Sequence, residues 1–284
     1  MSLPRFTVAP TFDLDEMTVP IFEHRTRNWF SRGEFGARVG APRILDTLKA
    51  RDWQVTWFVP GHAIDTFPEL CQRIVDEGHE IGHHGYCHED IGDASESDER
   101  AILEKGIDRI EKLTGLRPRG YRAPYWRSSF RTQQLLDEYG FLYDSSLMAD
   151  DFSPYHERTG DDLEKADPTG PYHFGTEMRL IQVPVAWHLD DWDHYELPSV
   201  GQAPLKSPPE VMAVWQAEFD FGYQRVPGGI LNLTMHPEVT GRGGRLLALE
   251  GLLDAFAAMD GVHVGRIDEY VNAWLAEGGA SGHR

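Results

Sequence analysis

Two hydrophobic patterns alternate along the chain. Short β-branched or aromatic runs, typical of buried strands, are separated by longer segments whose apolar residues recur at helical spacing. The runs predict strands at residues 6–12, 55–59, 80–82, 120–123, 178–186, 230–234 and 262–264. The longer segments predict helices at residues 42–50, 67–77, 98–113, 130–139, 246–259 and 267–275, and another helix after Ser207. Repeated βα units imply parallel strands wrapped by helices, which is an α/β fold.

Two helix starts carry a capping-box pattern. Thr66 is followed by Glu69, and Ser207 by Glu210, each with a proline in the first turn. In such a box the hydroxyl and the carboxylate each bind a backbone N–H that the helix leaves unpaired. We therefore expect one helix to begin after each of these residues.

Two stretches break the βα pattern, at about residues 18–39 and 153–176. Long excursions in a compact α/β fold are often lids or binding loops, so we expect surface loops that take part in substrate recognition. We expect residues 278–284 to form a disordered tail. With 284 residues, the simplest organisation is one domain over residues 1–284.

Composition narrows the choice of partners and compartment. Asp and Glu outnumber Lys and Arg by 46 to 27, and a net charge of -19 would repel nucleic acid and anionic membrane surfaces. Cys71 and Cys87 form no CxxC pair, which fits a reducing compartment. The first ten residues lack the apolar core of a signal peptide, and no apolar run approaches the length of a membrane span. We expect a soluble, cytoplasmic protein.

Two carboxylates, Asp13 and Asp15, stand at the end of the first predicted strand. In a parallel α/β fold the functional side chains gather at the carboxyl ends of strands. Residues i and i+2 of an extended segment point to the same face, so both carboxylates can reach one site. One could then ligate a metal while the other accepts a proton. Alone, however, such a pair also fits two solvated acids at a turn.

A histidine pair, His84 and His88, follows the third predicted strand. If the chain begins a helical turn there, the i, i+4 spacing places both imidazoles on one face, an arrangement suited to zinc, iron or nickel. His83 should then point elsewhere. Cys87 is expected to pack, because a fourth protein ligand would close a site that needs room for water.

Three further groups stand at predicted strand ends. Arg122, in an Arg-Ala-Pro-Tyr run, could fix a catalytic carboxylate by a bidentate pair, while the proline stiffens the loop so that a backbone N–H can be aimed. A surface Arg beside an aromatic core is the alternative. The other groups are residues 187–192, with His188 and two acids, and His236. A histidine polarised by an aspartate suits a general acid for an amine leaving group.

In this order the motifs resemble the polysaccharide deacetylase family, the NodB-homology group also called carbohydrate esterase family 4. The resemblance covers nearly the whole chain and implies a deformed, seven-stranded TIM-like (β/α) barrel. It also implies a catalytic base at Asp13 and one divalent metal ion held by Asp15, His84 and His88. Zinc is favoured, with iron, nickel and cobalt as alternatives.

The remaining family motifs imply further roles. Arg122 would orient Asp13, and the Tyr125 backbone N–H would help bind the oxyanion. Asp191 would partner His236, although the neighbouring Asp190 leaves that register open. His236 would then protonate the leaving nitrogen after attack by metal-activated water.

Within the family, residues 56–62, 78–82 and 235–238 are similar to an intracellular, often tetrameric branch. That branch includes a peptidoglycan-deacetylase-like enzyme, cyclic imide hydrolases and metal-independent allantoinases. We therefore expect a homotetrameric hydrolase of non-peptide C–N bonds, acting on a small cyclic imide or amide or on an N-acetylated sugar. The expected cytoplasmic location slightly favours the small molecule.

Two rival interpretations stay open. A metal-independent, allantoinase-like enzyme is disfavoured because Asp15, His84 and His88 are all present. A catalytically silent carbohydrate-binding protein is suggested by the eight tryptophans. The presence of Asp13 beside the metal-binding triad argues against it.

Overall fold

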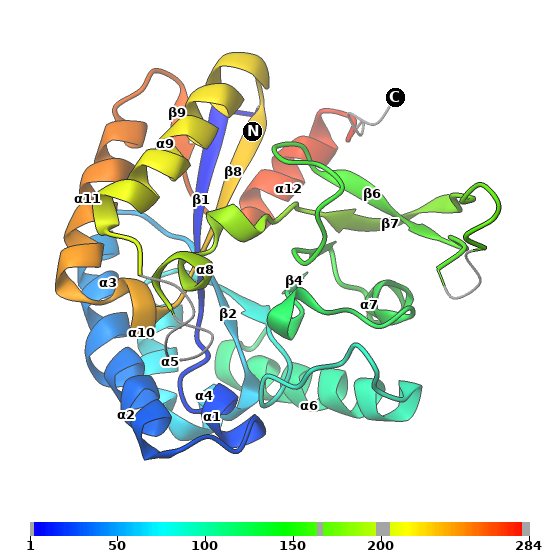
Figure 1. The fold of residues 1–284 in the computed structure, drawn as a ribbon, viewed down its shortest axis with the longest axis horizontal. Coiled ribbons are helices and arrows are strands. Elements are labelled where there is room, and N and C mark those ends of the chain that lie inside the picture. The colour runs from blue at the N-terminus through cyan, green and yellow to red at the C-terminus, as the bar shows by residue number, and fades with distance from the viewer. Residues whose placement is uncertain (1–2, 164–166, 197–204, 280–284) are drawn as a thin grey trace.

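The computed structural model describes residues 3–163, 167–196 and 205–279, and its centre is one curled β-sheet (Figure 1). The sheet has nine strands in the order β6-β7-β5-β4-β3-β2-β1-β8, with β9 paired to β1. The strands are β1 Phe6–Asp13, β2 Thr56–Val59, β3 Glu80–His83, β4 Gly120–Tyr121, β5 Tyr143–Asp144, β6 Tyr155–Thr159, β7 Thr176–Gln182, β8 Gly229–Met235 and β9 Val262–Val264. Every strand that the hydrophobic pattern predicts is present.

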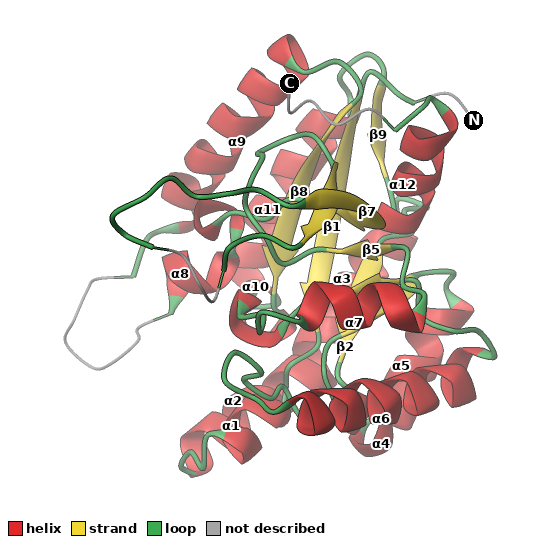
Figure 2. Ribbon diagram, turned by 90° about the vertical axis from the view of Figure 1, so that its right-hand side faces the viewer, coloured by secondary structure: helices red, strands yellow, loops and turns green. Residues whose placement is uncertain are grey.

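The sheet is parallel except for the antiparallel β6–β7 pair at its edge. It curls into a half-barrel, which confirms the deformed (β/α) barrel class (Figure 2). It has nine strands where the resemblance implied seven, since β6 extends the edge and the short β9 joins β1. An isolated bridge between Asp190 and Thr234 also brings the segment after β7 beside β8.

Helices cover the outer face of the sheet (Figures 1 and 2). They are α1 Thr18–Phe22, α2 Arg27–Phe35, the π-helix η1 Gly36–Gly40, α3 Ala41–Lys49, α4 Gly61–Thr66, α5 Pro68–Asp76, α6 Glu96–Thr114, the 3-10 turn η2 Pro124–Trp126, α7 Thr132–Tyr139, the 3-10 turn η3 Trp187–Leu189, α8 Asp191–Tyr195, α9 Pro208–Arg225, α10 Pro237–Thr240, α11 Gly243–Ala257 and α12 Ile267–Ala276. All the predicted helices are present. Within the described residues, no helix combines the length and apolarity needed to cross a bilayer.

Only one of the two predicted capping boxes forms. Ser207 and Glu210 make both reciprocal bonds at the start of α9. Thr66 instead ends α4, and its hydroxyl donates to the backbone oxygen of His62 at 2.8 Å. Helix α5 begins after Phe67 without a side-chain cap. The Thr66 prediction was wrong because a second short helix directly precedes α5.

The expected surface loop at residues 18–39 is helical instead, forming α1, α2 and most of η1. This segment packs against the turn after β1 so closely that only glycine fits at Gly33. A Cβ there would lie 2.2 Å from the backbone oxygen of Glu16. This contact, which local sequence patterns do not reveal, holds the helices against the barrel. The prediction of a loop at 153–176 is also partly wrong, because β6 and the start of β7 pair there as antiparallel strands. Of the expected tail, residues 280–284 lie outside the described residues.

His83, the last residue of β3, lies beneath α6. Its Nδ1 accepts the Gly85 N–H at 3.1 Å, so its Nε2–H donates to the backbone oxygen of Leu103 at 3.1 Å. Burial lowers the pKa of this imidazole to about 3. Gly106 provides the space, because a Cβ there would lie 2.2 Å from His83 Nε2. The expectation that His83 points away from the histidine pair is confirmed.

We predict that Gly106→Ala destabilises the protein by about 1–3 kcal/mol, because the added methyl must displace His83 and the end of β3. Urea denaturation measures the change in the free energy of unfolding. The matched control is Gly251→Ala in α11, where a Cβ meets nothing within 4 Å. That change should stabilise the protein by up to about 1 kcal/mol through helix propensity. Equal stabilisation by both substitutions would contradict the packing argument.

Candidate metal centre and active site

A cavity of about 330 Å³ lies where several strands end. Its walls include Asp15 after β1, His84 after β3, Ala123 after β4 and His236 after β8. The carboxyl ends of parallel strands meet at one edge of the sheet, which is why residues so far apart in the chain converge.

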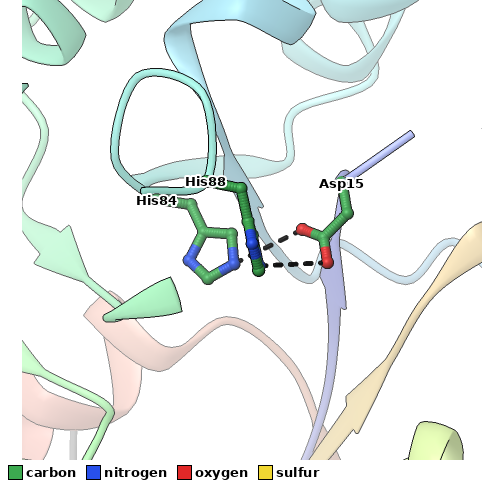
Figure 3. Close-up of side chains that lie close together, drawn as sticks. All are labelled: Asp15, His84 and His88. Atoms are coloured by element: carbon green, nitrogen blue, oxygen red, sulfur yellow. Dashed lines mark ion pairs between the residues drawn. The ribbon is translucent and has the colours of Figure 1, made fainter. Parts of the chain in front are cut away.

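Asp15, His84 and His88 point toward one another in this cavity (Figure 3). Asp15 Oδ1 lies 3.4 Å from His84 Nε2, and Asp15 Oδ2 lies 3.3 Å from His88 Nε2. All three side chains are buried, and one ligand atom from each lies within 4.8 Å of the others. Burial raises the pKa of Asp15, but the imidazoles of His88 and His84 outweigh it and hold that pKa well below its usual value.

The histidine pair does not sit on a helical turn. After β3 the chain makes a tight turn with Gly85 at φ +70° and His88 at φ +56°. The Glu89 carboxylate accepts the Tyr86 N–H at 2.9 Å and closes this turn. The left-handed backbone at His88, unusual for a residue with a side chain, is the kind of local strain that functional sites retain. The expected convergence is correct, but the expected helical geometry is not.

The donor atoms fit a divalent cation. His84 Nδ1 lies 2.7 Å from the backbone oxygen of Arg122, so that nitrogen carries the proton and Nε2 keeps its lone pair. His84 Nε2 and Asp15 Oδ1 are buried without a hydrogen-bond partner in the described part of the chain. Two imidazole nitrogens and one carboxylate, with a cavity beside them, match the open ligand set of catalytic zinc. Cys87 is half-buried, and its sulfur faces the backbone oxygen of Thr18, so it is not part of this cluster.

Asp13 is held by the fully buried Arg122. One guanidinium nitrogen, Nη1, donates to Asp13 Oδ1 at 2.7 Å and to Thr11 Oγ1 at 2.8 Å. The other nitrogens bind Ser145, and the guanidinium lies 4.1 Å from the centre of the Phe58 ring. The contact with Asp13 is therefore single rather than bidentate. The other Asp13 oxygen, Oδ2, lies 3.8 Å from His84 Nε2 and faces the histidine pair.

His236 is partnered by Asp191. Asp191 Oδ1 lies 2.7 Å from His236 Nδ1, and Oδ2 accepts the His236 backbone N–H and the Thr240 hydroxyl. Asp190 lies further away, at 3.7 Å from the same ring nitrogen, and caps α8 by accepting the Trp192 N–H. Burial raises the pKa of Asp190 to about 8. The sequence left open which aspartate bonds to His236, and in the structure it is Asp191.

His236 also faces the metal-binding cluster, with Nε2 at 3.7 Å from Asp15 Oδ2. Burial lowers its pKa, but the Asp190 and Asp191 carboxylates outweigh that effect and raise it well above the usual value. His188, the other candidate in that region, is half-exposed and lies 3.4 Å from Glu218. It does not line the cavity.

Tyr125 lies on the cavity wall in a left-handed conformation, at φ +58°. Its ring packs at 4.4 Å against the imidazole of His88. Its hydroxyl donates to Glu23 Oε1 at 3.0 Å. The side chain therefore links a metal-binding histidine to the segment between α1 and α2.

An aromatic and charged wall that the sequence patterns did not predict lies beside these residues. Glu23, Arg25 and Trp29 come from α2 and the segment before it, and Trp187 packs against Trp126 at 4.7 Å on the cavity wall. The expectation that residues 18–39 take part in the site agrees with this placement. The described residues of the 153–176 segment line a different hollow. No pattern in the sequence singled out these individual side chains.

Comparison with known proteins places this arrangement in a family. A family model described as polysaccharide deacetylase matches residues 30–143. A solved structure described as a polysaccharide deacetylase from Mycobacterium smegmatis is 36% identical, with a TM-score of 0.83, over 96% of this chain and 91% of that one. A solved Puue allantoinase has a TM-score of 0.79 over 98% and 92% of the two chains, but at 24% identity it shares the fold alone.

Two curated relatives match over much greater lengths than the family model. A peptidoglycan deacetylase of Helicobacter pylori is 37% identical over 86% of this chain and 87% of its own length. A peptidoglycan deacetylase-like protein of Gibberella zeae is 34% identical over 79% and 71% of the two chains. With such relatives spanning most of both sequences, this chain belongs to the polysaccharide deacetylase family.

Proposed function

We propose that this deacetylase-like hydrolase is metal-dependent and cleaves amide-type C–N bonds other than peptide bonds. The observation that carries the proposal is the buried cluster of Asp15, His84 and His88, whose ligand atoms face one another. Among the described residues, Asp15 Oδ1 and His84 Nε2 have no hydrogen-bond partner. Burying such atoms unsatisfied costs free energy, and a bound cation would remove that cost. Family membership supports the reaction class.

Asp15, His84 and His88 would hold one divalent cation, with zinc favoured by two imidazoles and a carboxylate. Such a cation lowers the pKa of a water molecule and polarises a carbonyl oxygen. The protein orients its ligands beforehand, because the backbone oxygen of Arg122 fixes the His84 ring and the Tyr125 ring packs on His88.

Asp13 would act as the general base. Its bond to Arg122 through Oδ1 fixes the carboxylate and leaves Oδ2 facing His84, where it can take a proton from the attacking water. The backbone N–H of Tyr125, at the cavity wall, would stabilise the oxyanion that forms on the substrate carbonyl.

His236 would act as the general acid. Its Nδ1–H donates to Asp191, which leaves Nε2 facing the cavity with a proton when the ring is charged. The two neighbouring carboxylates favour this charged form. Transfer of the Nε2 proton to the departing nitrogen would release the amine and leave His236 neutral.

The substrate is proposed to be either an N-acetylated sugar or a small cyclic imide or amide. The peptidoglycan deacetylases among the relatives favour the sugar. A cavity of about 330 Å³ is at the small end for ligand sites and suits a single ring, which either class supplies. The tetramer and the cytoplasmic location remain proposals, to be checked by light scattering and by fractionation.

Two alternative functions would give different results in the same assays. The Puue allantoinase fold likeness keeps a metal-independent, allantoinase-like hydrolase in view, and turnover by metal-free protein would support it. A silent carbohydrate-binding protein would bind sugars saturably without hydrolysis when loaded with metal. The intact set of Asp13, Asp15 and both histidines favours the metal-dependent enzyme over both.

We predict that His84→Ala loses both bound metal and turnover, because one of only three protein ligands is removed. Elemental analysis and release of free amine from an N-acetylated sugar oligomer and a cyclic imide measure the two effects. His188→Ala is the matched control, since that half-exposed ring lies outside the cavity, and it should keep both. A His84→Ala protein with normal metal content would exclude this site.

We predict that Asp191→Asn lowers kcat by about 10²–10⁴-fold with metal content unchanged, because an amide in place of the carboxylate no longer favours the charged His236 ring. Asp190→Asn should cost less, since Asp190 lies 3.7 Å from His236 Nδ1 and its replacement leaves in place the Asp191 bond that orients the ring. Steady-state kinetics on metal-loaded proteins compares the two. A larger loss for Asp190→Asn would reverse the assignment.

A further inference from the structure

Among the described residues, the cavity wall carries one arginine, Arg25, and no lysine. The acidic residues of the described lining are Asp13, Asp15, Glu23, Asp190 and Asp193. Arg122 does not line the cavity, and its guanidinium is already hydrogen-bonded to Asp13. Arg25 has a side chain that is 42% exposed, so it sits at the rim rather than among the proposed catalytic groups.

Arg25 is held in place from two sides. Its Nε donates to Glu23 Oε2 at 2.6 Å, and its guanidinium lies 5.0 Å from the centre of the Trp29 ring. Glu23 is itself fixed, because its other oxygen accepts the Tyr125 hydroxyl at 3.0 Å. A guanidinium that is stacked and bonded through Nε loses little further freedom on binding a ligand.

The two Nη groups of Arg25 have no hydrogen-bond or ion-pair partner within the described ranges 3–163, 167–196 and 205–279. Their paired N–H bonds form the planar edge that matches the two oxygens of a carboxylate. Glu23 occupies only the Nε side of the fork. The arrangement is therefore that of an anion-binding group that is pre-oriented by protein contacts.

We propose that Arg25 binds a carboxylate of the substrate, so that the preferred substrate is an amide that also carries a carboxylate group. This inference rests on the proposed amide hydrolysis and specifies its substrate class. With its carboxylate on Arg25 at the rim, the substrate would direct the amide inward, toward Asp13 and the histidine pair.

The test compares two acetamido sugars that differ by one carboxylate-bearing group, N-acetylglucosamine and N-acetylmuramic acid. Zinc-loaded full-length protein is mixed with each in a stopped-flow instrument, and tryptophan fluorescence gives Kd before turnover. Arg25→Gln should raise Kd for N-acetylmuramic acid by about tenfold or more, as expected for losing a charge-assisted contact. Kd for N-acetylglucosamine should change by less than about twofold, because the neutral sugar makes no such contact.

Arg27→Gln is the matched control, since it removes the same charge from an exposed residue outside the cavity lining, and it should leave both Kd values unchanged. The proposal is overturned if wild-type protein binds the carboxylate sugar no better than the neutral one. It is also overturned if the two variants weaken binding equally. Amide hydrolysis without a preference for the carboxylate sugar would reject Arg25 as an anchor but keep the proposed function. A preference for the carboxylate sugar without hydrolysis would keep Arg25 as an anchor but reject the proposed function.

Discussion

The site depends on one buried cation, Arg122. A guanidinium without contact with water is tolerable only when its charge and donors are matched, and here Asp13, Thr11 and Ser145 match them. The side chain thereby ties β1 to β4 and the residue after β5. The backbone oxygen of Arg122 also orients the His84 ring. The proposed base and a proposed metal ligand are thus positioned by the same residue, and the parallel sheet brings both to one edge.

The sequence predicts every strand except β5 and β6, and most helices, because their apolar spacing is local and each strand is buried by the next βα unit. Asp13, Asp15, His84 and His88 could be chosen because the residues that follow parallel strands must converge. Where an element depends on distant contacts, local pattern fails. The α1–α2 segment becomes helical against the turn at Glu16, and its polar, glycine-containing sequence reads as a loop.

Details of the candidate site were equally beyond local pattern. The His84–His88 spacing suggests a helical turn, but Gly85 and the bond from Tyr86 to Glu89 impose a left-handed backbone at His88. Asp190 and Asp191 are equivalent in sequence. They separate in space because Asp190 caps α8 and leaves Asp191 to face His236.

Whether amide hydrolysis requires a cation on Asp15, His84 and His88 can be measured by chelation and reconstitution of the wild-type chain. Metal content and the rate of amine release from an N-acetylated sugar oligomer and a cyclic imide would be followed together. We expect turnover to disappear with the metal and to return in proportion to it, up to one ion per chain. Full turnover by the stripped protein would contradict this expectation.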